Sequence, residues 1–174
     1  MDCSVFIAVS LDGFIARTDG SVDWLSLVEA PDEDYGYQRF FDSIDTLVIG
    51  RSTYQLALGF EPWPYQGKRC VVLTHTQSSA RHAEEFFAGD VCALATRLAA
   101  EGAQRVYVDG GAVIQQFLAA GLLSELTLSV IPLLLGAGIP LFGSSTARDL
   151  KLELLAAQSF PSGLVQLRYR VPPP

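Results

Sequence analysis

Short apolar runs and segments of helical spacing alternate along the first two thirds of the chain. The runs 4–9, 46–49, 69–74 and 105–109 are almost continuously apolar, as is typical of strands that are covered on both faces. In other segments the apolar residues recur at intervals of three and four, which predicts helices packed on a sheet. We expect these helices at residues 32–44, 52–58, 91–101 and 112–120.

Capping residues mark the ends of these expected helices. Asp32 and Asp90 stand at two expected N-caps, and Gly59 and Gly121 follow two expected last turns. The stretch 10–31 has no clear period and contains several turn-forming residues. We expect it to be a long loop of the kind that covers a functional site.

The last third of the chain changes character. Residues 126–134, 151–160 and 164–171 read as strands, and Ser162-Gly163 is a plausible hairpin turn between the last two. Three prolines, 172–174, end the chain and are expected to form a disordered tail. The β–α repeats followed by a hairpin predict an α/β fold with a mixed, mainly parallel sheet.

The composition fits one domain over residues 1–171. The chain has 174 residues, of which 49% are hydrophobic and 18% charged, which excludes a disordered protein. The net charge of −7 argues against nucleic-acid binding, which needs a basic face. Three scattered cysteines and two histidines predict neither a metal site nor a disulfide framework and favour a cytoplasmic location. The apolar stretches are too short for a membrane span.

Several common motifs are absent or incomplete. Gly136-Ala137-Gly138 begins like a dinucleotide-binding fingerprint, but Leu141 stands where the third glycine belongs, so a glycine-rich turn between elements is expected. Before Gly67-Lys68, Pro62 replaces the first glycine of a phosphate-binding loop. No GxSxG elbow occurs in the sequence.

Three strand ends remain as candidate chemistry, because ligands of open α/β sheets bind at the carboxyl ends of parallel strands. Gly50-Arg51-Ser52-Thr53 combines a helix start, two hydroxyls and a cation, which suits a phosphate. Leu73-Thr74-His75 is a second polar strand end, and Gly110-Gly111 precedes a helix without Cβ atoms in the way. The alternatives are a cap with a surface arginine, a solvated loop and a tight turn.

These segments occur within a longer series of motifs: FIAVSLDGFIA, DGSVDWL, IDTLVIGRSTY, VVLT and RVYVDGGAVIQQFLAAGLLSELTLSVIPLLLGAGIPLF. Their order along nearly the whole chain resembles the dihydrofolate-reductase-like superfamily. More narrowly, it is similar to the reductase (C-terminal) domain of the bacterial riboflavin-biosynthesis deaminase-reductase, in a stand-alone form. The resemblance implies a three-layer domain with an eight-stranded, mostly parallel sheet, helices on both faces, and NADPH as cofactor. The zinc pattern of the deaminase half is absent.

The resemblance also implies roles for particular residues at the cofactor. The main chain of Ala8 and Val9, with Ile15, would face the nicotinamide. The adenine-side phosphates would lie on Gly50, Arg51, Ser52 and Thr53, with Arg51 beside the 2′-phosphate. Leu73, Thr74 and His75 would line the adenosine. Gly110 and Gly111 would hold the pyrophosphate, with Ala112, Val113 and Ile114 completing that wall.

The substrate side is less defined by motif. Counting back from the Gly50-Arg51 motif puts Asp34 where dihydrofolate reductase carries its substrate carboxylate, although an acidic first helical turn is an equal explanation. Trp24 would stack on a flat ring or fasten the loop to the core.

Three functions are compatible with the sequence. The favoured one is an NADPH-dependent reductase acting on a small heterocycle, most like 5-amino-6-(5-phosphoribosylamino)uracil reductase. The alternatives are a dihydrofolate or pterin reductase and a non-catalytic nucleotide-binding or assembly module. The apolar run 126–135, together with the habit of such relatives, predicts a homodimer through this region, the alternative being a central buried strand.

Overall fold

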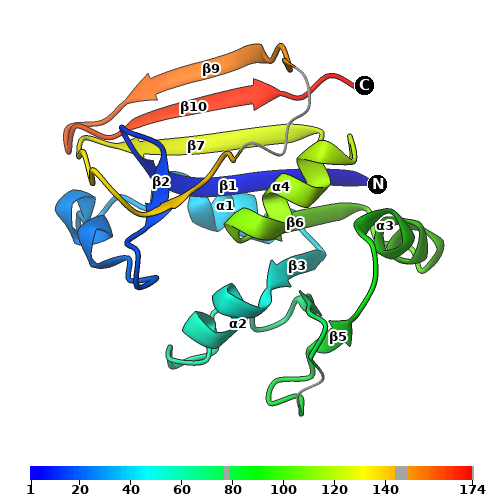
Figure 1. The fold of residues 1–174 in the computed structure, drawn as a ribbon. Coiled ribbons are helices and arrows are strands. Elements are labelled where there is room, and N and C mark those ends of the chain that lie inside the picture. Colours follow the sequence, from blue (N-terminus) through cyan, green and yellow to red (C-terminus); the bar gives the residue numbers. More distant parts are fainter. Residues whose placement is uncertain (77–78, 144–148, 174) are drawn as a thin grey trace.

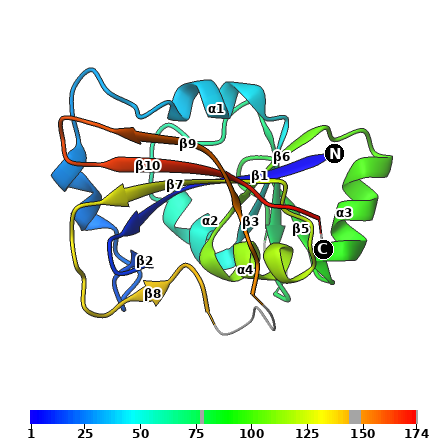
Figure 2. The same ribbon diagram turned by 90° about the horizontal axis from the view of Figure 1, so that it is seen from above.

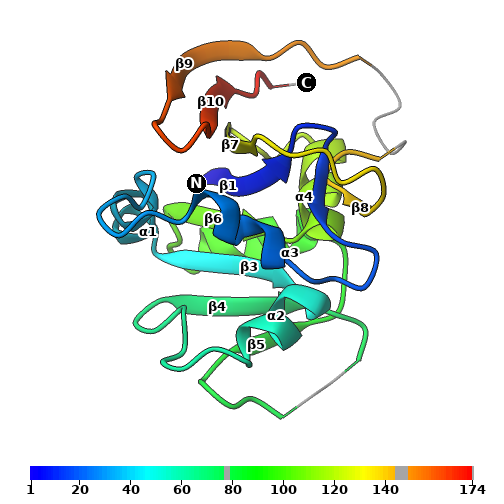
Figure 3. The same cartoon turned by 90° about the vertical axis from the view of Figure 1, so that its left-hand side faces the viewer.

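The computed structural model describes residues 1–76, 79–143 and 149–173, and within them the chain forms one eight-stranded sheet with helices on both faces (Figure 1). The strand order is β5-β4-β3-β6-β1-β7-β10-β9, which Figure 3 shows from the bottom to the top of the view. Strand β10 runs antiparallel to both of its neighbours, β7 and β9, and the other pairs of neighbouring strands in this sheet are parallel. The predicted α/β class and mainly parallel sheet are confirmed.

The elements have the following bounds. The large sheet contains β1 (Asp2–Ser10), β3 (Thr46–Gly50), β4 (Arg69–Leu73), β5 (Glu85–Phe87), β6 (Arg105–Asp109), β7 (Glu125–Ile131), β9 (Glu153–Ser159) and β10 (Val165–Arg170). A small separate sheet pairs β2 (Phe14–Ala16) with β8 (Ile139–Pro140). The helices are the 3-10 helix η1 (Asp23–Val28), α1 (Tyr37–Ser43), α2 (Arg51–Ala57), α3 (Val91–Ala100) and α4 (Gly111–Ala119).

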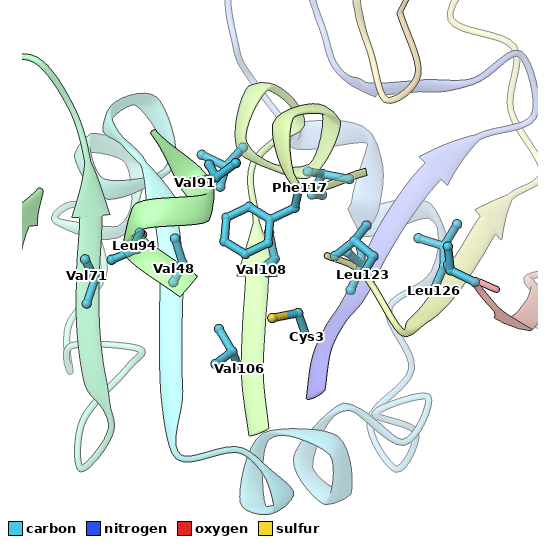
Figure 4. Packing of buried hydrophobic residues seen from close by; sticks show 14 of the residues in the cluster. Cys3, Val48, Val71, Val91, Leu94, Val106, Val108, Phe117, Leu123 and Leu126 are labelled. Atoms are coloured by element: carbon cyan, nitrogen blue, oxygen red, sulfur yellow. The ribbon is translucent and has the colours of Figure 1, made fainter. Parts of the chain in front are cut away.

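The two faces of the sheet are covered by different helices, with α1 and α4 on opposite sides in Figure 2. Successive side chains of β3 point to opposite faces of the sheet. Leu47 and Ile49 pack with α1 and α2 on one face, whereas Val48 packs with α3 and α4 on the other. Figure 4 shows the second core, in which Phe117 of α4 lies over Val108. The sheet is thus buried on both sides, which explains the continuous apolar runs of its central strands.

Two predictions about the first forty residues are wrong. The first full helix begins at Tyr37, not after Asp32, because Tyr35 and Gly36 have φ values of 56° and 78°, which a right-handed helix excludes. The stretch 10–31 is not a plain loop, since it contains β2 and η1.

The remaining boundaries differ by a few residues. Strands β1, β3, β4, β6, β9 and β10 and helices α2, α3 and α4 lie where the sequence predicts them. Strand β7 ends at Ile131, earlier than predicted, and Pro132 follows it. Gly163 has a φ of 85° in the β9–β10 turn, which confirms the hairpin. The short strands β5 and β8 were not predicted.

The apolar run of β7 is an internal strand of the chain. It pairs with β1 on one side and β10 on the other, and Leu126 and Ile131 are each 1% exposed. The strand part of the predicted dimer region is therefore covered within the chain, whereas Leu134, just after it, is 67% exposed. The exposed apolar side chains near the edge of the sheet lie instead on β9 and β10, where Leu154 is 56% and Val165 38% exposed.

The ends of the chain lie away from the carboxyl ends of the parallel strands, as Figure 1 shows. Pro172 and Pro173 follow β10 without regular secondary structure, and Pro174 of the predicted tail lies outside the described residues. No helix in the described part of the chain is both long and apolar enough to span a bilayer.

Candidate functional site

Three strand ends converge at one edge of the sheet. Thr53, in the first turn of α2, lies beside the end of β6, because a Cβ added to Gly110 would stand 2.6 Å from its Oγ1. Arg51 reaches the end of β4, where its Nη1 donates to the Thr76 Oγ1 at 3.0 Å. Arg51 and Ser52 are exposed. The structure therefore brings together Gly50–Thr53, the end of β4 and Gly110, as the sequence predicted.

The β6–α4 junction has a main-chain conformation that requires glycine. Gly110 has φ 92° and ψ 128°, a conformation that residues with a Cβ rarely adopt. The first N–H groups of α4 have no partner within the helix, and Ala112 is exposed beside them. This junction can hold an anionic group on main-chain N–H groups.

Two residues expected to form the wall of this site are core residues instead. Val113 is 2% and Ile114 0% exposed, and both side chains pack in the core beneath α4. The Ile114 N–H is already bonded to the Gly110 carbonyl at 2.9 Å. Their side chains cannot contact a ligand, and only the Val113 main chain remains near the helix start.

The end of β4 contributes a half-buried and an exposed side chain. Leu73 packs against the α3–α4 core, whereas His75 is exposed. The Thr74 N–H donates to the Phe87 carbonyl at 2.9 Å, and its Oγ1 accepts from the Thr76 N–H at 3.2 Å. These bonds fix the turn on which Thr76 meets Arg51.

The sheet opens between β1 and β6 near this edge. Strand β1 pairs with β7 as far as Ser10 but with β6 only as far as Ser4. Beyond that point the Tyr107 hydroxyl donates to the Phe6 carbonyl at 2.9 Å. Main-chain groups of alternate residues point to the same side of a strand, so Ala8, like Phe6, directs its N–H and C=O into the opening.

Val9 differs from Ala8 in orientation. Its side chain is 5% exposed and packs in the core on the α4 side. By the same alternation its main-chain groups point toward β7. Of the two residues expected to face a nicotinamide with their main chain, Ala8 is thus the one in position.

The segment after β1 is tied down over the start of α4. A Cβ on Gly111 would lie 2.8 Å from the Ile15 Cδ1, which places Ile15 against the helix start. The Asp12 carboxylate accepts from the Ser10 hydroxyl at 2.6 Å and from the Gly136 N–H at 2.7 Å. These hydrogen bonds lower the pKa of Asp12. Gly136 lies in the turn before β8, so the incomplete glycine fingerprint is a connection between strands, as predicted.

An open cavity of about 820 Å³ lies on the α1 face, next to the opening. Its floor comes from β1, β7 and the turn before β10, and its walls come from η1, the segment 29–35 and the start of α1. The lining residues are Phe6, Ala8, Leu25, Val28, Glu29, Ala30, Pro31, Glu33, Asp34, Tyr35, Tyr37, Ser129, Ile131 and Leu164. Ala8 borders both the cavity and the opening, so the two regions are adjacent.

Asp34 lines this cavity, as expected for a substrate carboxylate, and also anchors α1. Its two oxygens accept from the Gly36 and Gln38 N–H groups, each at 2.9 Å. These backbone hydrogen bonds lower the pKa of Asp34. The alternative of an acidic first helical turn is wrong, because α1 begins at Tyr37 and no acidic residue lies in its first turn.

Trp24 is not among the lining residues. It is 2% exposed and packs with Val28, Ile131 and Leu164. The structure therefore favours the expectation that it fastens the segment to the core rather than stacking on a ligand.

Asp109 is a candidate functional residue that the sequence reasoning missed. It ends β6 beside the opening, and its Oδ1 accepts from the Gly110 N–H at 2.8 Å. Burial raises its pKa to about 6. Burial and then the charge of Asp109 raise the pKa of Tyr37, a cavity-lining residue, to about 12. A carboxylate directly after an apolar strand and before two glycines was the signal that could have identified it.

Comparisons with known proteins agree with the fold and extend over nearly the whole chain. The sequence model of the RibD C-terminal domain matches residues 3–166. The uncharacterized protein YwjB of Bacillus subtilis is 39% identical over 168 residues, covering 95% of each chain. The crystal structure of a putative riboflavin biosynthesis protein from Shewanella sp. PV-4 is 34% identical, with a TM-score of 0.92 and 99% of each chain covered.

A more distant structure gives the relation to larger proteins. The deaminase/5-amino-6-(5-phosphoribosylamino)uracil reductase of Thermotoga maritima shares the fold with a TM-score of 0.73 at 14% identity. The match covers 98% of this chain and 56% of that protein, so this chain corresponds in fold to one part of it. On the family match and the close relatives, the chain belongs to the RibD C-terminal domain family.

Proposed function

We propose that this protein is an NADPH-dependent reductase that delivers a hydride to a flat heterocyclic substrate. The observation that carries the proposal is that Ala8 borders both the opening of the sheet and the cavity. A ring bound where the pairing of β1 with β6 ends would lie beside Ala8, which also lines the cavity. Membership of the RibD C-terminal domain family supports the same activity.

The residues at the strand ends fit a nicotinamide cofactor. Gly110 lets the Thr53 hydroxyl pack against the β6–α4 junction, where a Cβ would clash with it, so a hydroxyl lies next to the α4 N–H groups that suit a phosphate. Arg51 lies at the same edge with its guanidinium exposed and suits a 2′-phosphate, which NADPH carries and NADH lacks. When bound, the cofactor supplies the hydride, and the chain supplies binding and orientation.

Asp109 is proposed to hold the proton that accompanies hydride transfer. Its Oδ1 is engaged by the Gly110 N–H, which leaves Oδ2 to carry the proton. With a pKa of about 6, the carboxyl group is partly protonated near neutral pH, as a general acid must be. Burial and then the charge of Asp109 raise the pKa of Tyr37, which lines the cavity, so the Asp109 carboxyl group lies within electrostatic reach of the cavity wall.

The direct test is oxidation of NADPH by the purified protein. The dihydrofolate and the aminopyrimidine substrates are offered separately, and the loss of reduced-cofactor absorbance is followed. Oxidation with either one supports the reductase, and the faster one identifies the ring type. Cofactor binding without oxidation over a panel of heterocycles would favour a non-catalytic nucleotide-binding module instead.

We propose in addition that the protein forms a homodimer in the cytoplasm. Strand β9 is an unpaired edge of the sheet with Leu154 largely exposed, and such edges are normally covered. Cys3 and Cys70 are buried free thiols, which suits a reducing compartment. Light scattering at micromolar concentration tests the dimer, and a monomer would refute it.

A further inference from the structure

The charge of the cavity has one sign. Among the lining residues that the structure describes, the charged ones are Glu29, Glu33 and Asp34, and none is a lysine, arginine or histidine. All three acidic residues are exposed at the rim. A phosphate brought into this cavity would meet carboxylates and no cation.

The main-chain groups that could bind an anion at the rim are already occupied. The Gly36 and Gln38 N–H groups donate to Asp34, and the Tyr35 N–H donates to Glu33 at 2.8 Å. A helix start can attract anions through such groups. Here the carboxylates of the chain satisfy these donors, so the start of α1 offers little to a phosphate.

The rest of the cavity is suited to a flat ring. Phe6 and Tyr37 meet edge to face with their ring centroids 5.6 Å apart, and both line the cavity. On the floor, the buried Ser129 hydroxyl accepts from the Gln166 amide at 3.1 Å, which leaves its proton free to be donated. Aromatic walls with a few polar groups are typical of sites for small heterocycles.

We propose that the substrate of this cavity carries no phosphate or carboxylate and is an uncharged or cationic flat heterocycle. Its N–H donors face the rim carboxylates, which in ionised form only accept hydrogen bonds. This inference rests on the proposed reductase function and narrows it, because it places the phosphorylated aminopyrimidine outside the preferred substrates.

The test compares two ligands that differ only by the phosphate. 5-Amino-6-ribosylaminouracil and its 5′-phosphate are titrated into the purified protein by calorimetry, with and without bound NADP⁺. The riboside is expected to bind at least ~10-fold more tightly, because the phosphate adds repulsion at the rim. The ratio is expected to shrink as salt is added.

Charge reversal at the rim identifies the cause of the preference. Glu29→Arg is the informative variant, because the Glu29 carboxylate makes no hydrogen bond or ion pair with any described residue and supports no turn. It is expected to abolish or invert the ratio of the two affinities. Glu61→Arg, an equal charge change at an exposed position outside the cavity lining, is the matched control and is expected to leave the ratio unchanged.

The outcomes separate the substrate class from the reductase function. Equal or tighter binding of the phosphate, no binding of either ligand, or an unchanged ratio in Glu29→Arg would overturn the inference. NADPH oxidation followed in parallel reports on the function. Tighter binding of the riboside without NADPH oxidation would support the inferred substrate class and refute the reductase function. Faster oxidation with the phosphorylated ligand would support the reductase function and refute the inferred substrate class.

Discussion

The strand-end edge and the cavity are neighbouring regions with opposite chemistry. The edge offers main-chain N–H groups, hydroxyls and the cation of Arg51, and its shape depends on glycines. The cavity offers aromatic and aliphatic side chains with a rim of carboxylates. They meet at Ala8.

This difference explains how a chain with a net charge of −7 can accept an anionic cofactor. Positive and negative side chains lie in different regions, so the local electric field at the strand-end edge need not have the sign of the net charge of the chain. The same segregation gives each region its own selectivity. We therefore predict that phosphate is favoured at the strand ends and disfavoured in the cavity.

Asp109 lies between the strand-end edge and the cavity, so its substitution is expected to have the largest effect on turnover. Asp109→Asn removes the proposed proton donor, and turnover is expected to fall ~10²–10⁴-fold. In the wild type, turnover should decline as pH rises through about 6, because the acid loses its proton. The pH profile of the variant should be flat there.

The control for this experiment is Asp32→Asn, at an exposed position outside the cavity lining. It should retain full turnover. If Asp109→Asn keeps the activity and the pH profile of the wild type, the proton comes from another group.

The same carboxyl group should make stability depend on pH. Because the pKa of Asp109 is raised from 3.8 to about 6 on folding, its contribution favours the folded state below pH 4. This contribution is lost as pH rises to about 6, by roughly 3 kcal/mol. Urea unfolding at pH 4 and pH 7 measures the change. Asp109→Asn should lack this part of the decline, and an identical decline in the variant would refute the assignment.

A methyl group at the β6–α4 junction is expected to distort the strand-end edge and to leave the cavity unchanged. Gly110→Ala places a Cβ 2.6 Å from the Thr53 Oγ1 at a φ of 92°. The strain of about 1–3 kcal/mol would be relieved by moving the main chain, so NADPH affinity should fall ~10–100-fold. Fluorescence titration with NADPH measures it.

Gly67→Ala is the matched control, because Gly67 has a φ of 80° with nothing within 4 Å of an added Cβ. It should lose stability through the same backbone strain and keep its cofactor affinity. Equal cofactor affinities of the two variants would mean that the Gly110 junction does not hold the cofactor.

Arg51 tests the cation of the edge. Arg51→Ala should weaken NADPH by ~10–100-fold, since a charge-assisted hydrogen bond contributes about 1.5–3 kcal/mol, and should leave NADH nearly unchanged. The loss should be larger at low salt. Arg105→Ala, at an exposed position at the start of β6, serves as the control. Equal weakening of both cofactors would assign Arg51 to the fold.

The smallest effect is expected at the rim of the cavity. Asp34→Ala removes the acceptor for the Gly36 and Gln38 N–H groups and should lower the free energy of unfolding by about 1 kcal/mol. Asp34→Asn should lose less than the alanine variant, since its single amide oxygen can accept from only one of the two N–H groups. Chemical denaturation compares the two, and no loss in the alanine variant would remove the capping role.

The convergence of residues at the strand-end edge was predictable because its signals are local in sequence. Each strand end is a short apolar run followed by glycine or a hydroxyl, and the order of elements places Gly50, Leu73 and Gly110 side by side. Val113 and Ile114 were misassigned because their motif position said nothing of burial, whereas the helical spacing from Gly110 turns both toward the core.

The cavity was hardly predictable. Its lining comes from β1, η1, the segment 29–35, β7 and the turn before β10, so no single motif contains it. The start of the first helix was predicted too early because the acidic residues 32–34 resemble a first helical turn. The sequence does not show that Tyr35 and Gly36, which follow them, adopt left-handed conformations. The orientation of Trp24 was also not predictable, because an aperiodic stretch gives no pattern that shows whether an aromatic side chain faces the core or a ligand.

The crystal structure of the protein with bound NADPH tests the central claim most directly. The account predicts the 2′-phosphate at Arg51, the pyrophosphate at Gly110-Gly111 and the nicotinamide between β1 and β6, beside the Ala8 main chain and open to the cavity. A cofactor bound elsewhere, or a nicotinamide separated from the cavity by the core, would contradict it.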